Sequence, residues 1–258
     1  MSNVKFELDG SLAIVTFNNP PLNLLGKELV AGVTQAFEEA EKFNPRGLLL
    51  QAEGDNFSAG ADINMFSKLL PSQAREMLSS FLGLLHQLES LPYPTMAAVQ
   101  GICVAGGLEI ALSMDMIWAG DTAMLGQAEA SIGAIPFAGG AQRLAARCGV
   151  AKAKEIVFTG KFYPAAKFEE LNIVNRVVPT QELKDKARKF MKGISENGPT
   201  LAYKAVKEIL AEYQVQGIAD ADRLTLDKSV GIFETEDLKT GIASMLAQGP
   251  GKAIFVGK

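Results

Sequence analysis

The chain has 258 residues, of which 48% are hydrophobic and 21% are charged, and these proportions exclude a disordered or fibrous protein. At roughly 150 residues per domain, this length predicts one large domain, or one domain with a small appendage. The 25 Lys and Arg residues against 29 Asp and Glu residues give a net charge of −4, so no overall positive field attracts nucleic acid or anionic lipid. We therefore predict neither a nucleic acid nor a membrane as a partner.

The residues that usually build metal sites, disulfides and catalytic triads are scarce. Cys103 and Cys148 cannot form a disulfide framework, and their apolar or small neighbours favour buried free thiols over a reactive pair. The only histidine, His86, lies in a helical-looking apolar run with no motif nearby, so we expect neither a metal site nor a histidine-based triad. Phosphate-binding fingerprints of the Gly-x-Gly-x-x-Gly and Gly-x-x-x-x-Gly-Lys types do not occur.

The N-terminal residues 1–6 lack a charged start followed by an apolar stretch, and no uninterrupted apolar run of about 18 residues is present. We expect no secretory signal and no membrane span. This points to a reducing compartment and a cytoplasmic location.

Strand and helix patterns alternate along the first two thirds of the chain. Two alternating runs at 6–8 and 12–17 flank Asp9-Gly10 and predict a β-hairpin. Helical periodicity at 27–43 is followed by a short apolar strand at 48–52. Further helices are predicted at 72–91, 108–114, 139–148 and 151–158, and further strands at 95–99, 116–119, 124–125 and 174–178.

From residue 180 onward the patterns are almost entirely helical. The predicted helices are 182–194, 199–213, 218–230 and 235–246. This order of elements predicts an α/β core over residues 1–195 and an all-helical region over residues 196–258. That helical region could fold back on its own core or pack on another subunit.

Two segments of small residues follow predicted strands and lead into helix starts, at 57–63 and 101–109. In α/β folds, ligands collect beyond the carboxyl ends of strands, where helix starts present unpaired N–H groups and small residues permit close approach. Two such starts side by side could hold one ligand oxygen between two backbone donors, as an oxyanion hole does. Alternatively, both segments are tight turns that pack a helix on a strand.

Two glutamates lie among apolar or small residues, Glu109 in a predicted helix and Glu129 in a glycine-containing segment. Burial and mutual repulsion would raise the pKa of at least one of them, which prepares a carboxyl group for general acid–base catalysis. Alternatively, Glu109 is a first-turn residue favoured by the helix dipole, and Glu129 lies in a surface loop.

These residues resemble the crotonase superfamily, also called the enoyl-CoA hydratase/isomerase family, over essentially the whole chain. The most specific matches are residues 57–63, 97–110, 126–129 and 133–144, and residues 233–237 resemble the start of the family's closing helix. The resemblance implies a crotonase-like spiral of ββα units followed by a C-terminal all-helical trimerisation region. We therefore expect a homo-oligomer, either a trimer or a dimer of trimers.

The resemblance also implies an acyl-CoA thioester substrate and no metal or redox cofactor, because coenzyme A is part of the substrate. It places the oxyanion-hole amides at Ala61 and Gly106, and the catalytic carboxylates at Glu109 and Glu129. In the usual family assignment Glu129 is the acid towards Cα and Glu109 is the base on water, but this division of labour stays open. The family's substrate and CoA site corresponds to Asn23, Leu24, Ala59, Ala61, Asp62, Ile63, Gly106, Pro136 and Phe137.

The chain departs from the common hydratase pattern at three places. Ala105 replaces the first glycine of Gly-Gly-Gly, Ala128 replaces the proline of Gln-Pro-Glu, and Phe137 stands after Pro136 where many members have glycine. The bulky ring of Phe137 leaves the acyl chain length open.

Because both glutamates are present, we predict an enoyl-CoA hydratase. The alternatives are an enoyl-CoA delta-isomerase that uses the second glutamate alone, another acyl-CoA enzyme of this fold such as a hydrolase or ring-directed hydratase, and a non-catalytic scaffold such as an RNA-binding relative. The acidic composition counts against the scaffold.

Overall fold

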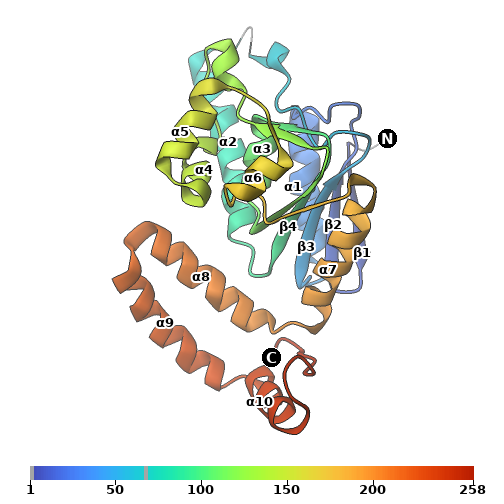
Figure 1. The fold of residues 1–258 in the computed structure, drawn as a ribbon, viewed down its shortest axis with the longest axis vertical. Helices are drawn as coiled ribbons and strands as arrows, with labels where there is room; N and C mark the ends of the chain where they lie inside the picture. Colours follow the sequence, from blue (N-terminus) through green and yellow to red (C-terminus); the bar gives the residue numbers. More distant parts are fainter. Residues whose placement is uncertain (1–2, 67–68) are drawn as a thin grey trace.

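The computed structural model describes residues 3–66 and 69–258, so residues 1 and 2 of the N-terminal segment lie outside it. A six-stranded sheet in the order β1-β2-β3-β4-β6-β9 forms its centre (Figure 1). Its strands are β1 (Val4–Asp9), β2 (Leu12–Phe17), β3 (Gly47–Ala52), β4 (Thr95–Val99), β6 (Met116–Gly120) and β9 (Arg176–Val178). The first two strands are antiparallel, with Val4 opposite Phe17, and the other neighbours are parallel. The hairpin predicted around Asp9-Gly10 is confirmed.

Helices pack on both faces of this sheet because side chains alternate between the faces along each strand. The longer helices are α1 (Lys27–Glu41), α2 (Pro71–Glu89), α4 (Gly140–Cys148), α5 (Val150–Thr159), α7 (Leu183–Asn197), α8 (Thr200–Gln216), α9 (Ile218–Phe233) and α10 (Glu236–Gln248). Val15 and Phe17 of β2 belong to the core cluster that includes residues of α1 and α2. Leu12 and Ile14, on the other face of the same strand, pack in a separate cluster with α7. The predicted α/β core is confirmed.

A second sheet of three strands lies beside the first. It consists of β5 (Ile102–Val104), β7 (Met124–Gly126) and β8 (Tyr163–Pro164). The turn from β4 into β5 needs Gly101, because its φ is +55° and an added Cβ would lie 2.0 Å from the carbonyl oxygen of Asp55. The small-residue segment at 101–109, expected as a loop between a strand and a helix start, thus contains the strand β5, and β8 and the short helix α6 (Ala165–Glu170) were not predicted at all.

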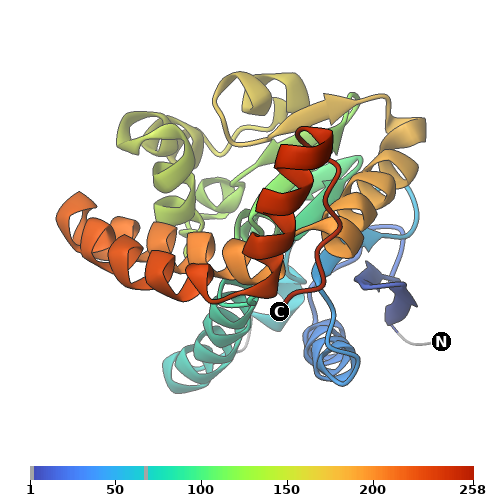
Figure 2. The same ribbon diagram turned by 90° about the horizontal axis from the view of Figure 1, so that it is seen from below.

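The C-terminal helices extend away from the core. Figure 1 shows α8 and α9 side by side below the sheet, and Figure 2 shows α10 and the C-terminal tail on the same side. Arg46 joins this region to the core, because its guanidinium donates to the Oγ1 atom of Thr200 at 2.8 Å and to the carbonyl oxygens of Gly198 at 2.6 Å and Phe255 at 3.1 Å. Lys207 of α8 adds an ion pair with Asp115 at 2.8 Å. Within the described part of the chain, no helix has the length and hydropathy needed to cross a membrane.

Candidate active site

The two small-residue loops lie against each other. The N–H of Ser58 donates to the carbonyl oxygen of Ile102 at 3.0 Å, and the N–H of Val104 donates to the carbonyl oxygen of Ser58 at 3.1 Å. A Cβ atom built on Gly60 would lie 3.3 Å from the amide nitrogen of Gly106. The strand after Gly101 therefore aligns the first loop with the start of α3 (Gly106–Leu112).

Ala61 and Gly106 supply two backbone N–H groups at this junction. A Cβ atom on Gly106 would lie 3.8 Å from the amide nitrogen of Ala61, so the two amides are close neighbours. Gly106 is the first residue of α3, so its N–H has no partner within the helix. Among the described residues, neither amide donates a hydrogen bond. The arrangement supports an oxyanion hole, and the alternative of two tight turns does not explain why both donors are left free.

Ala105 holds the turn before α3 in an unusual conformation. Its φ of +51° and ψ of −129° lie in a region that residues with a Cβ avoid. The position is the one where the family's hydratases often have glycine, and the backbone geometry gives the physical reason. This residue precedes Gly106, the first residue of α3, so its conformation sets how the chain enters the helix.

Glu109 lies one turn into α3 and is only 2% exposed. Its Oε1 atom accepts hydrogen bonds from the N–H groups of Ala138 and Gly140, each at 2.8 Å. Burial raises the pKa of Glu109, whereas these two bonds and the nearby positive charge of Arg143 act in the opposite direction. The first-turn position is confirmed, but the side chain points into the protein and is held by two backbone donors.

Glu129 begins the short 3-10 helix from Glu129 to Ile132 and is 7% exposed, so the alternative of a surface loop residue is wrong. Burial raises its pKa to about 7, and the negative charge of Glu109 adds to the rise. Gln127 is fully buried beside it, and with its amide nitrogen turned toward Glu129 it donates to both carboxylate oxygens at 3.0 Å.

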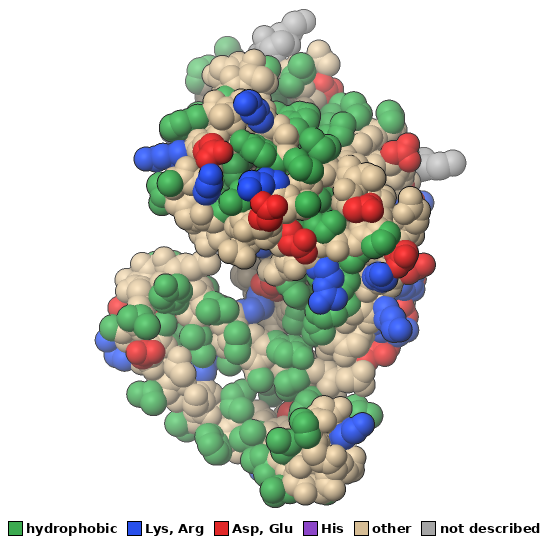
Figure 3. Space-filling view, viewed as in Figure 1, with side chains coloured by type: hydrophobic (Ala, Val, Ile, Leu, Met, Phe, Trp, Pro, Cys, Tyr) green, Lys and Arg blue, Asp and Glu red, His purple; other side chains and the backbone are tan. Residues whose placement is uncertain are grey.

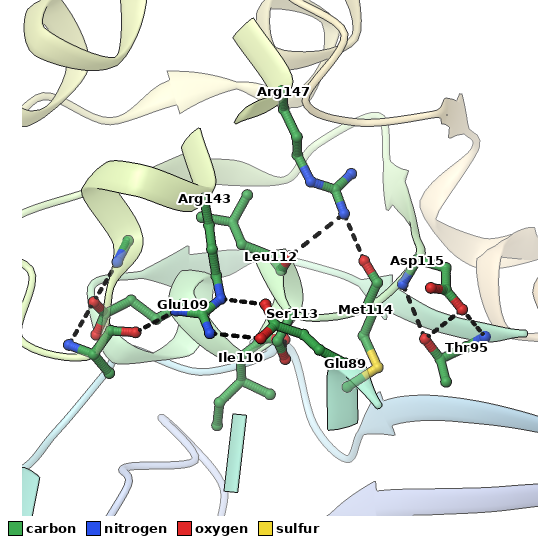
Figure 4. Close-up of polar contacts among 12 residues, drawn as sticks. Glu89, Thr95, Glu109, Ile110, Leu112, Ser113, Met114, Asp115, Arg143 and Arg147 are labelled. Atoms are coloured by element: carbon green, nitrogen blue, oxygen red, sulfur yellow. Dashed lines mark hydrogen bonds and ion pairs between the residues drawn. The ribbon is translucent and has the colours of Figure 1, made fainter. Parts of the chain in front are cut away.

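Gly140 connects the surroundings of the two carboxylates. A Cβ atom at this position would lie 3.0 Å from Cγ of Glu109 and 2.1 Å from the amide end of Gln127. The first turn of α4 can approach Glu109 and Gln127 only because residue 140 has no side chain. Figure 4 shows Glu109 with Arg143 of α4 next to it.

The residues expected to line the substrate and CoA site fall into two groups. Asn23 is buried, and its side chain accepts from the N–H of Asn19 and donates to the carbonyl oxygens of Glu53 and Asn56, so it braces the loops. The others adjoin the two loops in sequence: Ala59, Asp62 and Ile63 lie within two residues of Ala61, Leu24 precedes Leu25, which pairs with Ala61, and Pro136 and Phe137 directly precede Ala138. Ile63 is 62% exposed. The ring of Phe137 lies 5.7 Å from that of Phe66, a contact that no sequence signal indicated.

Three further side chains of the site were not predicted. Gln127 and Arg143 lie within the segments that carry the family resemblance, so their proximity to the glutamates was the available signal. Glu89 lies 54 positions before Arg143, and only the tertiary structure brings the two together.

Cys103 lies in β5 opposite Ser58 of the first loop, whereas Cys148 ends α4 and His86 lies on α2. Cys103 is a buried free thiol, as predicted, and burial raises its pKa. Cys148 is half-buried, and desolvation raises its pKa as well. His86 is exposed on α2. Within the described residues, no three or more His, Cys, Asp or Glu side chains come together as a metal site would need.

Comparison with known proteins decides the family. The family model described as enoyl-CoA hydratase/isomerase matches residues 7–250. The chain belongs to the enoyl-CoA hydratase/isomerase family.

Relatives within the enoyl-CoA hydratase/isomerase family match over nearly the full length. A probable enoyl-CoA hydratase of Mycobacterium tuberculosis is 33% identical over 245 residues, which cover 93% of this chain and 93% of the relative. A probable enoyl-CoA hydratase of Bacillus subtilis is 30% identical over 250 residues, with 95% and 96% of the two chains covered.

Solved structures of the family agree with the fold. An enoyl-CoA hydratase structure from Geobacillus kaustophilus superposes with a TM-score of 0.92 at 31% identity, over 99% of this chain and 98% of the other. An enoyl-CoA hydratase from Bacillus anthracis gives a TM-score of 0.92 at 27% identity, over 99% and 100% of the two chains. The predicted crotonase-like fold with a helical C-terminal region is confirmed.

Proposed function

We propose that the protein is an enoyl-CoA hydratase, a hydro-lyase that adds water across the 2,3 double bond of an enoyl-CoA thioester. One observation carries the proposal: two buried carboxyl groups, Glu109 and Glu129, interact electrostatically close to a helix start that presents a free backbone amide. Family membership and the hydratase names of the relatives support the acyl-CoA substrate.

The oxyanion hole supplies the electrostatic part of the mechanism. The thioester carbonyl oxygen accepts hydrogen bonds from the N–H groups of Ala61 and Gly106. Addition of water at Cβ moves charge onto this oxygen, and donors already aimed at it stabilise the enolate-like transition state. Loss of one such donor typically costs about 3 kcal/mol of transition-state stabilisation.

The two carboxyl groups move the protons. Glu109 is held by two N–H donors that favour its ionised form, so it accepts a proton from the attacking water. Glu129, with a pKa of about 7, retains a proton near neutral pH and donates it to Cα. The water oxygen bonds to Cβ, the former double-bond electrons take the proton at Cα, and transfer of one proton from Glu109 to Glu129 restores the starting state. Neither a metal nor a redox cofactor is needed in this scheme.

The structure favours hydration over isomerisation of the double bond. An isomerase can shift a proton with the carboxylate at position 129 alone, whereas hydration needs a second group to activate water. Burying Glu109 is costly, and the two amides aimed at its Oε1 atom offset that cost. Such an arrangement is expected where a second carboxylate takes part in the reaction.

Loss of the conjugated-enoyl absorbance of crotonyl-CoA tests the proposal. We expect rapid loss with the parent protein and a strong reduction in Glu109→Gln and Glu129→Gln, each of which keeps the side-chain shape. A 3-enoyl-CoA substrate provides the comparison. The hydratase proposal is wrong if the parent changes neither crotonyl-CoA nor an eight-carbon 2-enoyl-CoA, or if both variants hydrate the substrate as fast as the parent.

We further propose that three copies assemble through the C-terminal helices, alone or as a dimer of trimers. Figure 3 shows apolar side chains gathered where Figure 1 places α8, α9 and α10. Leu226, Val230 and Phe233 of α9 are 71%, 67% and 72% exposed, and their spacing of three to four residues places them on one face of the helix. A further copy of this chain is the proposed partner of this face.

Light scattering after size-exclusion chromatography measures the assembly. We expect a mass of three or six chains for the parent and a smaller species for Leu226→Asp, while Leu8→Asp on the β1 hairpin stays assembled. A monomeric parent would contradict this proposal. We also propose a cytoplasmic location. The free thiols of Cys103 and Cys148 support it, because thiols stay reduced in that compartment.

A further inference from the structure

Arg143 joins three parts of the structure with one side chain. Its Nε and Nη2 atoms donate to the two carboxylate oxygens of Glu89 at 2.6 and 2.8 Å, and its Nη1 atom donates to the carbonyl oxygen of Ala138 at 2.8 Å. The side chain is only 10% exposed. Figure 4 shows Arg143 reaching from α4 to Glu89, at the end of α2. A bidentate guanidinium–carboxylate pair fixes orientation as well as distance.

Ala138 links Arg143 to Glu109 through its own backbone groups. Its carbonyl oxygen accepts from Arg143, and its own N–H donates to Oε1 of Glu109. Gly139 allows the turn to close, because its φ is +84° and an added Cβ would collide with Nη1 of Arg143. Gly140 then returns a second N–H to the same oxygen of Glu109. The turn 138–140 thus has Arg143 on one side and Glu109 on the other.

We infer that Arg143 is a positioning residue for hydration: by holding the turn 138–140, it keeps the two amides aimed at the carboxylate of Glu109. This inference rests on the proposed hydratase function. Among the described residues, the hydrogen bonds and ion pairs of Arg143 are to Glu89 and Ala138, so it acts on the carboxylate of Glu109 through the backbone and through its charge.

The charged groups around Glu109 determine in which direction its pKa moves when one of them is removed. Arg143 on α4 lowers the pKa of Glu109, against the larger upward effect of burial. Glu129 faces it from the neighbouring 3-10 helix, and the negative charge of Glu89 on α2 lies behind Arg143 and offsets part of its charge. Removing Arg143 therefore raises the pKa of Glu109, whereas removing the charge of Glu89 lowers it.

Steady-state hydration of crotonyl-CoA across a pH series tests this. For Arg143→Met we expect kcat to fall about 10- to 100-fold through misplacement of Glu109, with KM within about twofold of the parent. The acidic limb of kcat/KM, which reports the base, moves to higher pH. Arg143→Lys keeps a charge but not the planar fork, so we expect its limb to stay near that of the parent while kcat falls.

Two further variants separate this role from simple loss of an ion pair. Arg188→Met removes another arginine that binds two carboxylates, Glu7 and Asp9, on the far side of the sheet, and we expect parental kcat and pH profile. Glu89→Gln is a milder change at a half-exposed residue, and we expect its acidic limb to move to lower pH, opposite to that of Arg143→Met.

A folded Arg143→Met protein with the kcat and acidic limb of the parent would overturn the inference. If Arg143→Met does not fold, Glu89→Gln decides, and an unmoved limb in that variant overturns the inference. If the parent itself hydrates neither crotonyl-CoA nor an eight-carbon 2-enoyl-CoA, the proposed function fails separately. In that case the effect of Arg143 on the pKa of Glu109 is measured by ¹³C-carboxyl NMR titration, which needs no enzyme activity. The Glu109 signal is assigned as the one missing from Glu109→Gln. An unshifted Glu109 titration in both the Arg143 and Glu89 variants would contradict the inference there as well.

Discussion

Gly140 provides a sharp test of how tightly the two carboxylates are packed. The Gly140→Ala substitution adds one methyl group at a position where Cγ of Glu109 lies 3.0 Å away and the amide end of Gln127 lies 2.1 Å away. Both distances are shorter than normal contacts. Because Glu109 and Gln127 are buried, neither side chain can swing into solvent to make room.

The cost follows from the groups that must move. Overpacking of a buried site typically costs about 1–3 kcal/mol. Displacing Gln127 also weakens its hydrogen bonds to the carboxyl group of Glu129, and an ordinary hydrogen bond contributes about 0.5–1.5 kcal/mol. The better helix propensity of alanine offsets about 1 kcal/mol of this. We therefore expect Gly140→Ala to lower the free energy of unfolding by about 2 kcal/mol, and kcat to fall about 100-fold because both carboxyl groups of the proposed site are displaced.

Urea unfolding and crotonyl-CoA hydration measure the two effects on one preparation. Gly193→Ala is the matched control, because it lies inside α7 and no heavy atom comes within 4 Å of its added Cβ. We expect this control to gain about 0.5–1 kcal/mol and keep full activity. If Gly140→Ala unfolds at the same urea concentration as the parent and hydrates crotonyl-CoA at the same rate, the reasoning about this packing is refuted.

Three other expectations concern neighbouring groups. Because the folded pKa of Glu129 is about 7 and the ordinary value is 4.5, the folded state binds its proton more tightly, so the free energy of unfolding should fall as pH rises between these values. Urea unfolding at several pH values should show a smaller fall in Glu129→Gln. Ala105→Gly relieves a φ of +51° and should raise stability by about 1 kcal/mol in urea unfolding, with kcat retained. Phe137→Gly removes the ring that contacts Phe66, and the kcat/KM ratio of eight-carbon to four-carbon enoyl-CoA should rise about tenfold.

The sequence was sufficient for the elements whose own residues encode them. The strand at 48–52 and the helix at 27–43 are formed by apolar residues at the spacing of their secondary structure, and both are present. Glu109 was conspicuous because a charge within an apolar helix needs a partner. In each case the signal is contained within about fifteen residues of the chain.

Other features depend on contacts that no local pattern contains. β5 consists of three residues and pairs with β7 more than twenty positions away, so its small-residue surroundings resembled a loop. The partners of Glu109 are backbone amides at positions 138 and 140, and backbone groups leave no trace in residue type. The pairing of Arg143 with Glu89 was hidden because surface charges of both signs are frequent and most have no fixed partner.

The different surroundings of the two carboxyl groups explain how the same residue type could take opposite roles. Glu109 has two fixed N–H donors at 2.8 Å and a guanidinium nearby, all of which favour the ionised form over what burial alone would allow. For Glu129, burial and the negative charge of Glu109 both disfavour the ionised form, and the neighbouring group is the side-chain amide of Gln127. Burial, and to a smaller degree the negative charge of Glu109, raises the pKa of Glu129 to about 7, so the pair can enter the reaction as one base and one acid. The turn that holds Glu109 thus helps set the protonation of Glu129.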